Sequence, residues 1–127
     1  MYQLGVRKNF IAQHFLIGGD WGAENHPHSH AYVLEVVCDA KKTDQHNYLI
    51  DIVDLEKAIG EIVHRFAEHQ LNDFPEFHKT NPSLELFAKV IYLGLKPTLI
   101  RLKAESFKVV LWENEFCWAS YTEEKLA

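Results

Sequence analysis

Three histidines stand at alternate positions in AENHPHSHAY, residues 23–32. Side chains of a strand repeat every two residues, so His28 and His30 would project from one face and could bind the same ion. His14 could supply a third imidazole from a neighbouring strand. Three neutral imidazoles with one open position are the ligand set of a catalytic zinc, which lowers the pKa of bound water or polarises a substrate oxygen. The alternatives are a histidine-rich surface and competition from His26 as a ligand.

The segments around these histidines predict two strands joined by a loop. Residues 2–14 alternate loosely between apolar and polar side chains, which is typical of a strand that reaches His14. Residues 16–27 are rich in glycine and end in proline, so we expect a loop there. The stretch from His28 to Cys38 is rich in β-branched and aromatic residues and predicts the second strand, which a polar turn over residues 39–47 follows.

Two helices are expected next. The first has an apolar stripe with helical spacing, and Asp51 is its expected N-cap. That stripe consists of Leu55, Ala58, Ile59, Ile62, Val63 and Phe66. In the second, Asn81 is expected to cap, Pro82 suits the first helical position, and Gly94 and Pro97 mark the end. The stripe of this second helix consists of Leu84, Phe87, Ala88, Ile91 and Leu95.

The last part of the chain predicts two short strands. Residues 106–121 are mostly β-branched or aromatic, and the polar ENE at residues 113–115 breaks them. The order is therefore ββααββ in a single domain over residues 1–127. We expect an α+β fold whose two helices cover one face of an antiparallel sheet, while the other face meets water or a partner subunit.

Composition limits the classes of function. The net charge is −5, and the basic residues lie singly or in pairs, so nucleic acid is not an expected partner. No apolar run has the length of a membrane span, and the N-terminus lacks the apolar stretch of a signal peptide, so we expect no membrane and a soluble, cytoplasmic protein. Cys38 and Cys117 lie in apolar strand-like segments, which favours reduced core thiols over a disulfide.

Six stretches follow the order of motifs in one known family. The chain resembles the 6-pyruvoyl-tetrahydropterin synthase and 6-carboxy-tetrahydropterin synthase family, whose patterns include F-x-A-x-H, H-G-H-x-Y, L-D-H-x-x-L-N, N-P-T-x-E and a final E-T. The matching stretches are FIAQHFL (10–16), HSHAYVLEV (28–36), YLIDIVDLEK (48–57), AEHQLND (67–73), NPSLELFA (81–88) and VVLWENEFCWASY (109–121). The resemblance spans nearly the whole chain and implies the tunnelling fold, in agreement with the ββααββ order.

The resemblance implies roles for several residues. His14, His28 and His30 fall on the three zinc ligands of the family. Glu113 falls on the glutamate that accepts hydrogen bonds from the 2-amino group and N3 of the pterin ring, a charge-assisted bidentate contact. The alternative for Glu113 is a solvated acid in a hairpin turn. Ser83 falls where the family often has a threonine near the pterin, although it could equally serve only as a local helix cap.

The chain departs from the family at its catalytic base. A cysteine usually lies four residues before the first histidine of H-G-H, and that position is Glu24 here. A carboxylate can act as a base if burial or a metal adjusts its pKa, and some family members with glutamate at this position cleave the pterin side chain instead of rearranging it. The alternative is that Glu24 is a plain loop acid.

A second departure concerns the proton relay. The family's L-D-H-x-x-L-N becomes AEHQLN over residues 67–72, one residue shorter, with Glu68 in place of the aspartate. The resemblance makes His69 the relay histidine, and Glu68 would orient it, because a carboxylate fixes the imidazole tautomer. The alternative for His69 is a surface residue at a helix end. Ser29 replaces the central glycine of H-G-H and should not disturb the metal, because it points to the opposite face.

Taken together, these residues suggest a zinc-dependent lyase that acts on the side chain of 7,8-dihydroneopterin triphosphate or a related pterin, with 6-hydroxymethyl-dihydropterin as one product. The alternative is a catalytically impaired homologue that binds zinc and pterin. A chain of 127 residues encloses a deep cleft with difficulty. The family forms trimeric barrels that stack into hexamers, so the expected assembly is a homo-oligomer of two stacked trimers with sites between subunits.

Overall fold

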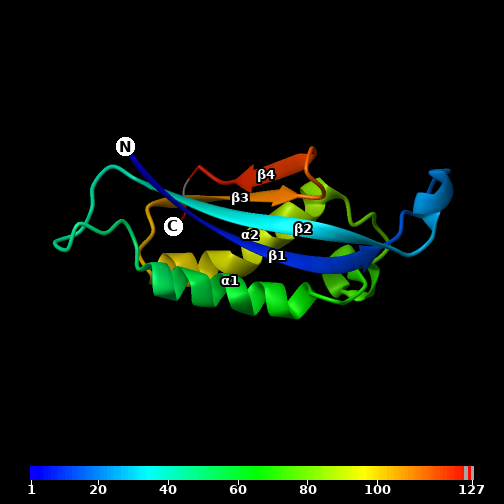
Figure 1. Ribbon diagram of the computed structural model, residues 1–127, viewed down its shortest axis with the longest axis horizontal. Coiled ribbons are helices and arrows are strands. Elements are labelled where there is room, and N and C mark those ends of the chain that lie inside the picture. Colours follow the sequence, from blue (N-terminus) through cyan, green and yellow to red (C-terminus); the bar gives the residue numbers. More distant parts are fainter. Residues whose placement is uncertain (125, 127) are drawn as a thin grey trace.

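The computed structural model describes residues 1–124 and 126, and it consists of a four-stranded antiparallel sheet with two α-helices on one face (Figure 1). This architecture confirms the predicted α+β class and ββααββ order. The sheet order is β1-β2-β3-β4. The strands are β1 (Tyr2–His14), β2 (His28–Ala40), β3 (Ser106–Trp112) and β4 (Trp118–Thr122), and the helices are α1 (Ile52–Phe66) and α2 (Leu84–Arg101). Three 3-10 turns lie in the connections, at Gly22–Asn25, Leu71–Asp73 and Pro75–Phe77.

Strands β1 and β2 form a long hairpin that is paired along its full length. The register runs from Tyr2 opposite Ala40 to His14 opposite His28. Every second residue of β2 from Tyr32 to Ala40 is buried under the helices, while the residues between them face the opposite side and stay partly exposed. This alternation with period two is the pattern on which the predicted strand depended.

Helix α1 begins as predicted and α2 does not. The side chain of Asp51 accepts a hydrogen bond from the backbone N–H of Val53, which caps α1. Helix α2 is capped by Ser83, whose hydroxyl accepts from the N–H of Leu86 at 3.1 Å. The predicted cap Asn81 is wrong, because its side chain instead accepts a hydrogen bond from the backbone of the loop that follows β1.

The predicted end of α2 is also wrong, because the helix passes through Gly94 and Pro97 to Arg101. Gly94 lies against α1, where an added Cβ would stand 2.5 Å from Cδ1 of Ile62. The glycine therefore serves the close approach of the two helices. Pro97 removes one helical hydrogen bond, but buried Leu95 and Leu99 on either side of it hold this turn against the sheet.

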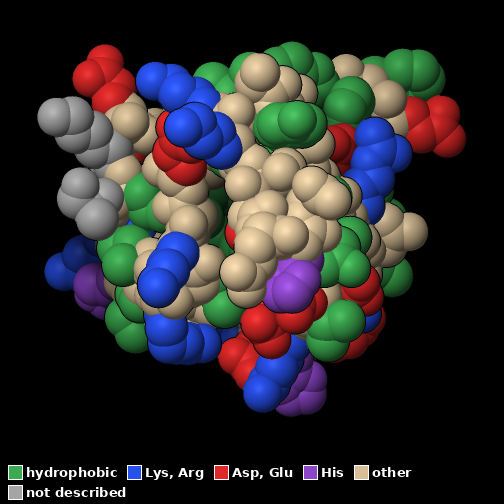
Figure 2. Space-filling model, turned by 90° about the vertical axis from the view of Figure 1, so that its left-hand side faces the viewer, with side chains coloured by type: hydrophobic (Ala, Val, Ile, Leu, Met, Phe, Trp, Pro, Cys, Tyr) green, Lys and Arg blue, Asp and Glu red, His purple; other side chains and the backbone are tan. Residues whose placement is uncertain are grey.

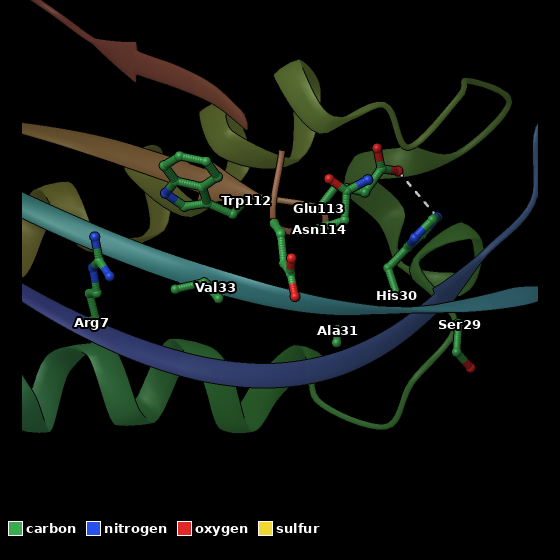
Figure 3. A pocket seen from close by; sticks show the side chains of 9 residues that line it. Arg7, Ser29, His30, Ala31, Val33, Trp112, Glu113 and Asn114 are labelled. Atoms are coloured by element: carbon green, nitrogen blue, oxygen red, sulfur yellow. Dashed lines mark ion pairs between the residues drawn. The ribbon is translucent and has the colours of Figure 1, made fainter. Parts of the chain in front are cut away.

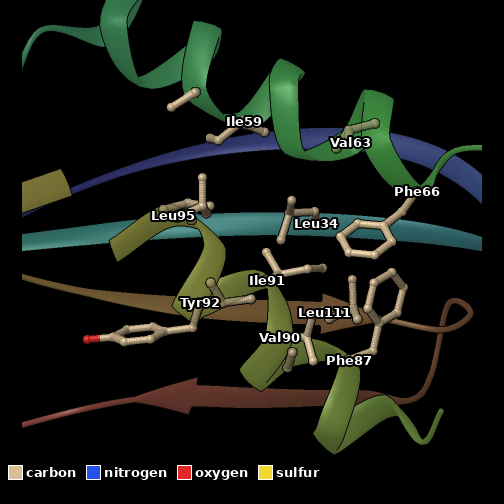
Figure 4. Packing of buried hydrophobic residues seen from close by; sticks show 14 of the residues in the cluster. Leu34, Ile59, Val63, Phe66, Phe87, Val90, Ile91, Tyr92, Leu95 and Leu111 are labelled. Atoms are coloured by element: carbon tan, nitrogen blue, oxygen red, sulfur yellow. The ribbon is translucent and has the colours of Figure 1, made fainter. Parts of the chain in front are cut away.

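The core between sheet and helices is rich in aromatic rings (Figure 4). Phe87 contacts Phe66 with a centroid distance of 5.2 Å, and Tyr92 of α2 stacks on Phe107 of β3 at 4.1 Å. Cys38 is buried in this core as predicted, and burial raises the pKa of its thiol to about 11. The same prediction was wrong for Cys117, which is exposed because it lies in the turn before β4.

The surface of the described residues mixes charges. Basic and acidic side chains lie near one another, among hydrophobic side chains, at the end of the molecule opposite the β1–β2 loop (Figure 2). Neither α1 nor α2, within residues 1–124 and 126, has the length and apolar character that a membrane crossing requires.

Candidate metal centre

The hairpin of β1 and β2 brings His14, His28 and His30 together. Each offers one ligand nitrogen, and these three atoms lie within 4.8 Å of one another. The centroid of the His14 ring lies 4.6 Å from that of His28 and 4.8 Å from that of His30. The register explains the cluster, because His14 pairs with His28 and His30 is two residues further along the same face. The structure thus assembles the three residues that spacing and resemblance single out.

Backbone carbonyls orient two of the rings. Nδ1 of His14 lies 3.0 Å from the carbonyl oxygen of Pro82, and Nδ1 of His28 lies 2.8 Å from that of His26. A carbonyl can only accept, so each Nδ1 donates its hydrogen and leaves the lone pair on Nε2. This carbonyl contact to the second ring nitrogen is typical of metal-binding histidines. His26 therefore contributes its backbone, and its imidazole stands outside the cluster.

The free nitrogens of this cluster are buried. Nε2 of His28 and Nε2 of His30 are shielded from solvent and have no hydrogen-bond partner among the described residues. His14 is only 4 % exposed, and burial, followed by the neighbouring His30 and His28, lowers its pKa although the Pro82 carbonyl opposes this. Clustered imidazole nitrogens that are buried without a hydrogen bond suit a zinc ion, so these three residues fit the expected metal.

A carboxylate lies beside this centre. Oε1 of Glu113 approaches Nε2 of His30 to 3.1 Å, outside hydrogen-bond geometry (Figure 3). Glu113 follows the last residue of β3 and opens the turn to β4, where its N–H donates to the carbonyl of Cys117 at 3.0 Å. The backbone of Glu113 is therefore held at the end of the sheet, and its side chain is 26% exposed.

Glu113 and His30 line one cavity of about 610 Å³. Its remaining lining residues are Arg7, Ser29, Ala31, Val33, Trp112, Asn114 and Glu115. Small side chains of β2 form its floor, and the Trp112 indole forms a wall, so a flat ligand of moderate size could lie between them. Figure 3 shows the cavity running from His30 along β2 towards Arg7.

The wall of the cavity is fixed by a cluster that sequence reasoning missed. Glu35 accepts a hydrogen bond from the indole N–H of Trp112 at 2.7 Å and pairs with Arg7 at 3.1 Å. These three residues come from three adjacent strands and meet on the face of the sheet away from the helices. To predict that these three residues meet, one would have needed the register of the three strands, which the sequence pattern does not determine.

Tyr32 was also missed as part of the surroundings of the site. It lies on β2 two residues after His30, with the ring centroids of the two residues 5.8 Å apart. Its pKa is raised by burial and, to a smaller extent, by the charge of Glu113. The phenol therefore stays protonated beneath the centre.

Glu24 lies in the 3-10 turn Gly22–Asn25 of the loop between β1 and β2. Its carbonyl accepts from the N–H of Leu16 at 2.8 Å, which closes the loop, and its side chain is exposed. The carboxylate is near enough for its charge to raise the pKa of His14, against the larger effect of burial. The structure thus puts Glu24 on the histidine side of the molecule without a direct contact to the cluster.

Glu68 does not orient His69 within the chain. Nδ1 of His69 lies 2.8 Å from the carbonyl of Ala67 instead. Glu68 has a left-handed backbone (φ 61°), its N–H donates to the carbonyl of Ile11 at 2.6 Å, and its side chain lines a different cavity over the outer face of the sheet. The expected orienting contact is therefore wrong in this chain, because the backbone turn separates the two side chains.

His69 and Ser83 lie outside the main cavity. His69 lines a small cavity with Gln70, Asp73 and Phe74, and its ring lies 5.9 Å from that of Phe74. The Ser83 hydroxyl is engaged in capping α2, which is the alternative role that the sequence left open. The structure thus brings together His14, His28, His30 and Glu113, while the cavity of Glu113 is lined by neither His69 nor Ser83.

The fold and the three-histidine centre define an α+β domain of the tunnelling-fold class. The family model described as 6-pyruvoyl tetrahydropterin synthase matches residues 3–124. The chain therefore belongs to the 6-pyruvoyl tetrahydropterin synthase family, as the motif resemblance predicted. A comparison with curated protein sequences finds no match.

Solved structures share the fold at low sequence identity. The 6-pyruvoyl tetrahydropterin synthase of Caenorhabditis elegans is 21% identical with a TM-score of 0.84, over 97% of this chain and 96% of that chain. The enzyme of Plasmodium vivax is 17% identical with a TM-score of 0.78, over 96% and 97%. Two further structures of the P. vivax enzyme carry substitutions of a catalytic glutamate, one to alanine and one to cysteine.

Proposed function

We propose that this protein is a zinc-dependent lyase that acts on the side chain of 7,8-dihydroneopterin triphosphate or a related pterin. The observation that carries the proposal is the cluster of His14, His28 and His30, in which Nε2 of His28 and Nε2 of His30 are buried and His30 lies beside the carboxylate of Glu113. His30 of this cluster and Glu113, whose carboxylate suits the edge of a heterocycle, line the same cavity. Family membership supports the same class of reaction.

The three histidines would bind the metal, and Glu113 would bind the pterin ring. His14, His28 and His30 would hold zinc through their Nε2 atoms, with two tautomers fixed by the carbonyls of Pro82 and His26. When bound, zinc supplies a Lewis acid that lowers the pKa of substrate hydroxyls. Glu113 would accept hydrogen bonds from the 2-amino group and N3 of the ring, which orients the side chain of the substrate towards the histidines.

Glu24 is our candidate for the general base. A base must reach the proton that it takes, and the exposed carboxylate of Glu24 in the loop between β1 and β2 would do so in the substrate complex. Its influence on the pKa of His14 supports a position near the centre. The P. vivax enzyme, which has a catalytic glutamate, supports the use of a carboxylate in this fold.

The proton relay is proposed to come from a neighbouring subunit. His69 lines a cavity that contains none of the three clustered histidines, so its imidazole would act on the site of a partner. The proposed assembly is a hexamer of two stacked trimers. Two features support it: β1 and β4 are the edge strands of the sheet, and the apolar side chains of Phe116 and Trp118 are 84% and 55% exposed at the β4 edge.

A second candidate function is a catalytically impaired zinc and pterin-binding homologue. It is favoured by the contact of His69 with Ala67 in place of Glu68, which leaves the relay without its carboxylate in the chain itself. Ser83 would then contribute only its cap to α2.

Product identification by mass spectrometry separates the two candidates. Zinc-loaded protein is incubated with 7,8-dihydroneopterin triphosphate, and the masses of pyruvoyl, carboxy and hydroxymethyl pterins are sought. A lyase yields one of them, with loss of product in the metal-stripped protein. Unchanged substrate together with tight pterin binding would favour the impaired homologue, and neither product nor binding would contradict both.

A further inference from the structure

We propose that the side-chain amide of Asn114 reads the 4-carbonyl group of the bound heterocycle, so that Asn114 and Glu113 together select a 2-amino-4-oxo ring. This inference rests on the proposed function, because it assumes that Glu113 binds the 2-amino and N3 edge of the same ring. It assigns a specificity-determining contact to a residue of the turn between β3 and β4.

The turn fixes which way the amide of Asn114 faces. Its Oδ1 accepts hydrogen bonds from the backbone N–H groups of Phe116 at 2.8 Å and Cys117 at 2.9 Å. A backbone N–H can only donate, so the oxygen must occupy this position and the NH₂ group must take the other. Among the described residues no acceptor is bonded to this NH₂ group, while Asn114 lines the same cavity as Glu113 and His30 (Figure 3).

The two neighbouring side chains present a pattern to the cavity. The Glu113 carboxylate offers two acceptors, and the Asn114 amide offers a donor. The edge of a 2-amino-4-oxopteridine presents the complement in order: an amino N–H, the ring N3–H, and the oxygen at C4. A site that bonds each polar group of a ligand discriminates strongly against an analogue that lacks one, because its own groups then stay unpaired.

The turn between β3 and β4 fixes Glu113 and Asn114 relative to each other. Its N–H is bonded to the Cys117 carbonyl, the residue whose N–H is held by Asn114. One five-residue turn therefore sets both the acceptor pair and the donor, and the relation between them does not depend on distant parts of the chain.

The variant Asn114→Asp tests the contact with little change of shape. An aspartate oxygen accepts from the same two backbone N–H groups, so the turn is kept, but the donor becomes an acceptor. Calorimetry on the zinc-loaded protein would measure Kd for pterin (2-amino-4-oxopteridine) and for 2,4-diaminopteridine. The ratio of the two constants is compared between wild type and variant, because that cycle cancels losses common to both proteins.

The expected result is a wild type that prefers pterin, and an Asn114→Asp protein in which this preference falls by about tenfold or more, the effect of one exchanged hydrogen bond. Ser120→Ala changes an exposed residue of β4 that does not line this cavity and should leave the ratio unchanged. If the Asp variant does not fold, Asn114→Ser removes the amide while its hydroxyl can still accept from the turn, and the same fall is expected.

An unchanged ratio in a folded variant, with pterin still bound by wild type, overturns the role of Asn114 and leaves the proposed function intact. A wild type that binds neither compound overturns the proposed function, and the role of Asn114 with it. The two failures are therefore distinguishable in one titration.

Discussion

Nε2 of His30 in β2 lies 3.1 Å from Oε1 of Glu113 at the end of β3. The histidine cluster and the carboxylate are thus neighbours within a single chain. The register of β2 with β3 pairs Val33 with Trp112, so the turn that carries Glu113 stands directly over the histidine end of β2. A ligand held by Glu113 would have its side chain next to the histidine nitrogens.

Replacement of Glu113 by glutamine should weaken pterin binding by roughly 10- to 100-fold. Glutamine presents an NH₂ group in place of one carboxylate oxygen, so a donor of the ligand loses its partner, and the charge assistance is lost too. Zinc content should stay at the wild-type value, because Glu113 is not one of the three clustered ligands. Calorimetric titration with pterin measures the effect, and an affinity equal to that of wild type would refute the anchoring role.

Removal of the Glu24 carboxylate should lower turnover by two to four orders of magnitude, roughly the contribution of a general base. Glu24→Ala should keep its zinc, since the side chain is exposed and outside the cluster. In Glu24→Cys, a thiolate near the metal should shift the product from hydroxymethylpterin towards a pyruvoyl or carboxy pterin. Turnover of Glu24→Ala at the wild-type rate would mean that this residue is only a loop acid.

The segment that carries Glu68 and His69 is clamped by an ion pair with a defined pH dependence. Arg65 donates two hydrogen bonds to Glu76 at 2.5 and 2.8 Å, and its guanidinium lies over the ring of Phe74. The Arg65 hydrogen bond lowers the pKa of Glu76 below its ordinary 4.5. A lowered acid pKa stabilises the fold above the unfolded value, and this contribution is lost as the pH falls below about 4.5 and through the folded value.

Glu76→Gln should therefore reduce the free energy of unfolding at pH 7 by no more than about 1 kcal/mol, because the pair is partly exposed. Denaturant unfolding of wild type and variant should show a difference at pH 7 that shrinks in acid. A difference that stays constant from pH 7 to pH 3 would contradict the assignment of the clamp to the ionised pair.

The period-two pattern of residues 28–38 was sufficient to predict that His28 and His30 share a face, and the cap at Asp51 followed from its place before an apolar stripe. Tertiary contacts decided what the sequence missed. The side chain of Asn81 accepts a hydrogen bond from the backbone N–H of Ile17 in the loop after β1, so it does not cap α2. Helix α2 continues through Pro97 because Leu95 and Leu99 on either side of it are buried. Arg7, Glu35 and Trp112 meet only through the strand register, which depends on the whole sheet.

The pattern of apolar and polar residues also did not predict the left-handed backbone conformation of Glu68. Non-glycine residues adopt it rarely, and here the bond of its N–H to the Ile11 carbonyl holds it. This single backbone angle decides that Glu68 and His69 do not meet within the chain.

Assembly should be visible in solution. Light scattering at micromolar concentration is expected to give the mass of a homo-oligomer, six copies in the proposed arrangement, because the edges β1 and β4 offer unpaired backbone groups. Dilution should reduce activity in step with dissociation if His69 serves the site of a partner. A monomer that still turns over substrate would contradict the proposal that each active site is shared between two subunits.

The most direct test of the central claim is the zinc content of purified wild type and His28→Ala, measured by elemental analysis after removal of loosely bound metal. His26→Ala is the matched control, because it removes an imidazole outside the cluster but keeps the backbone carbonyl that orients His28. We predict one zinc per chain in wild type and in His26→Ala, and a large loss in a folded His28→Ala protein. Stoichiometric zinc in His28→Ala would contradict the three-histidine centre.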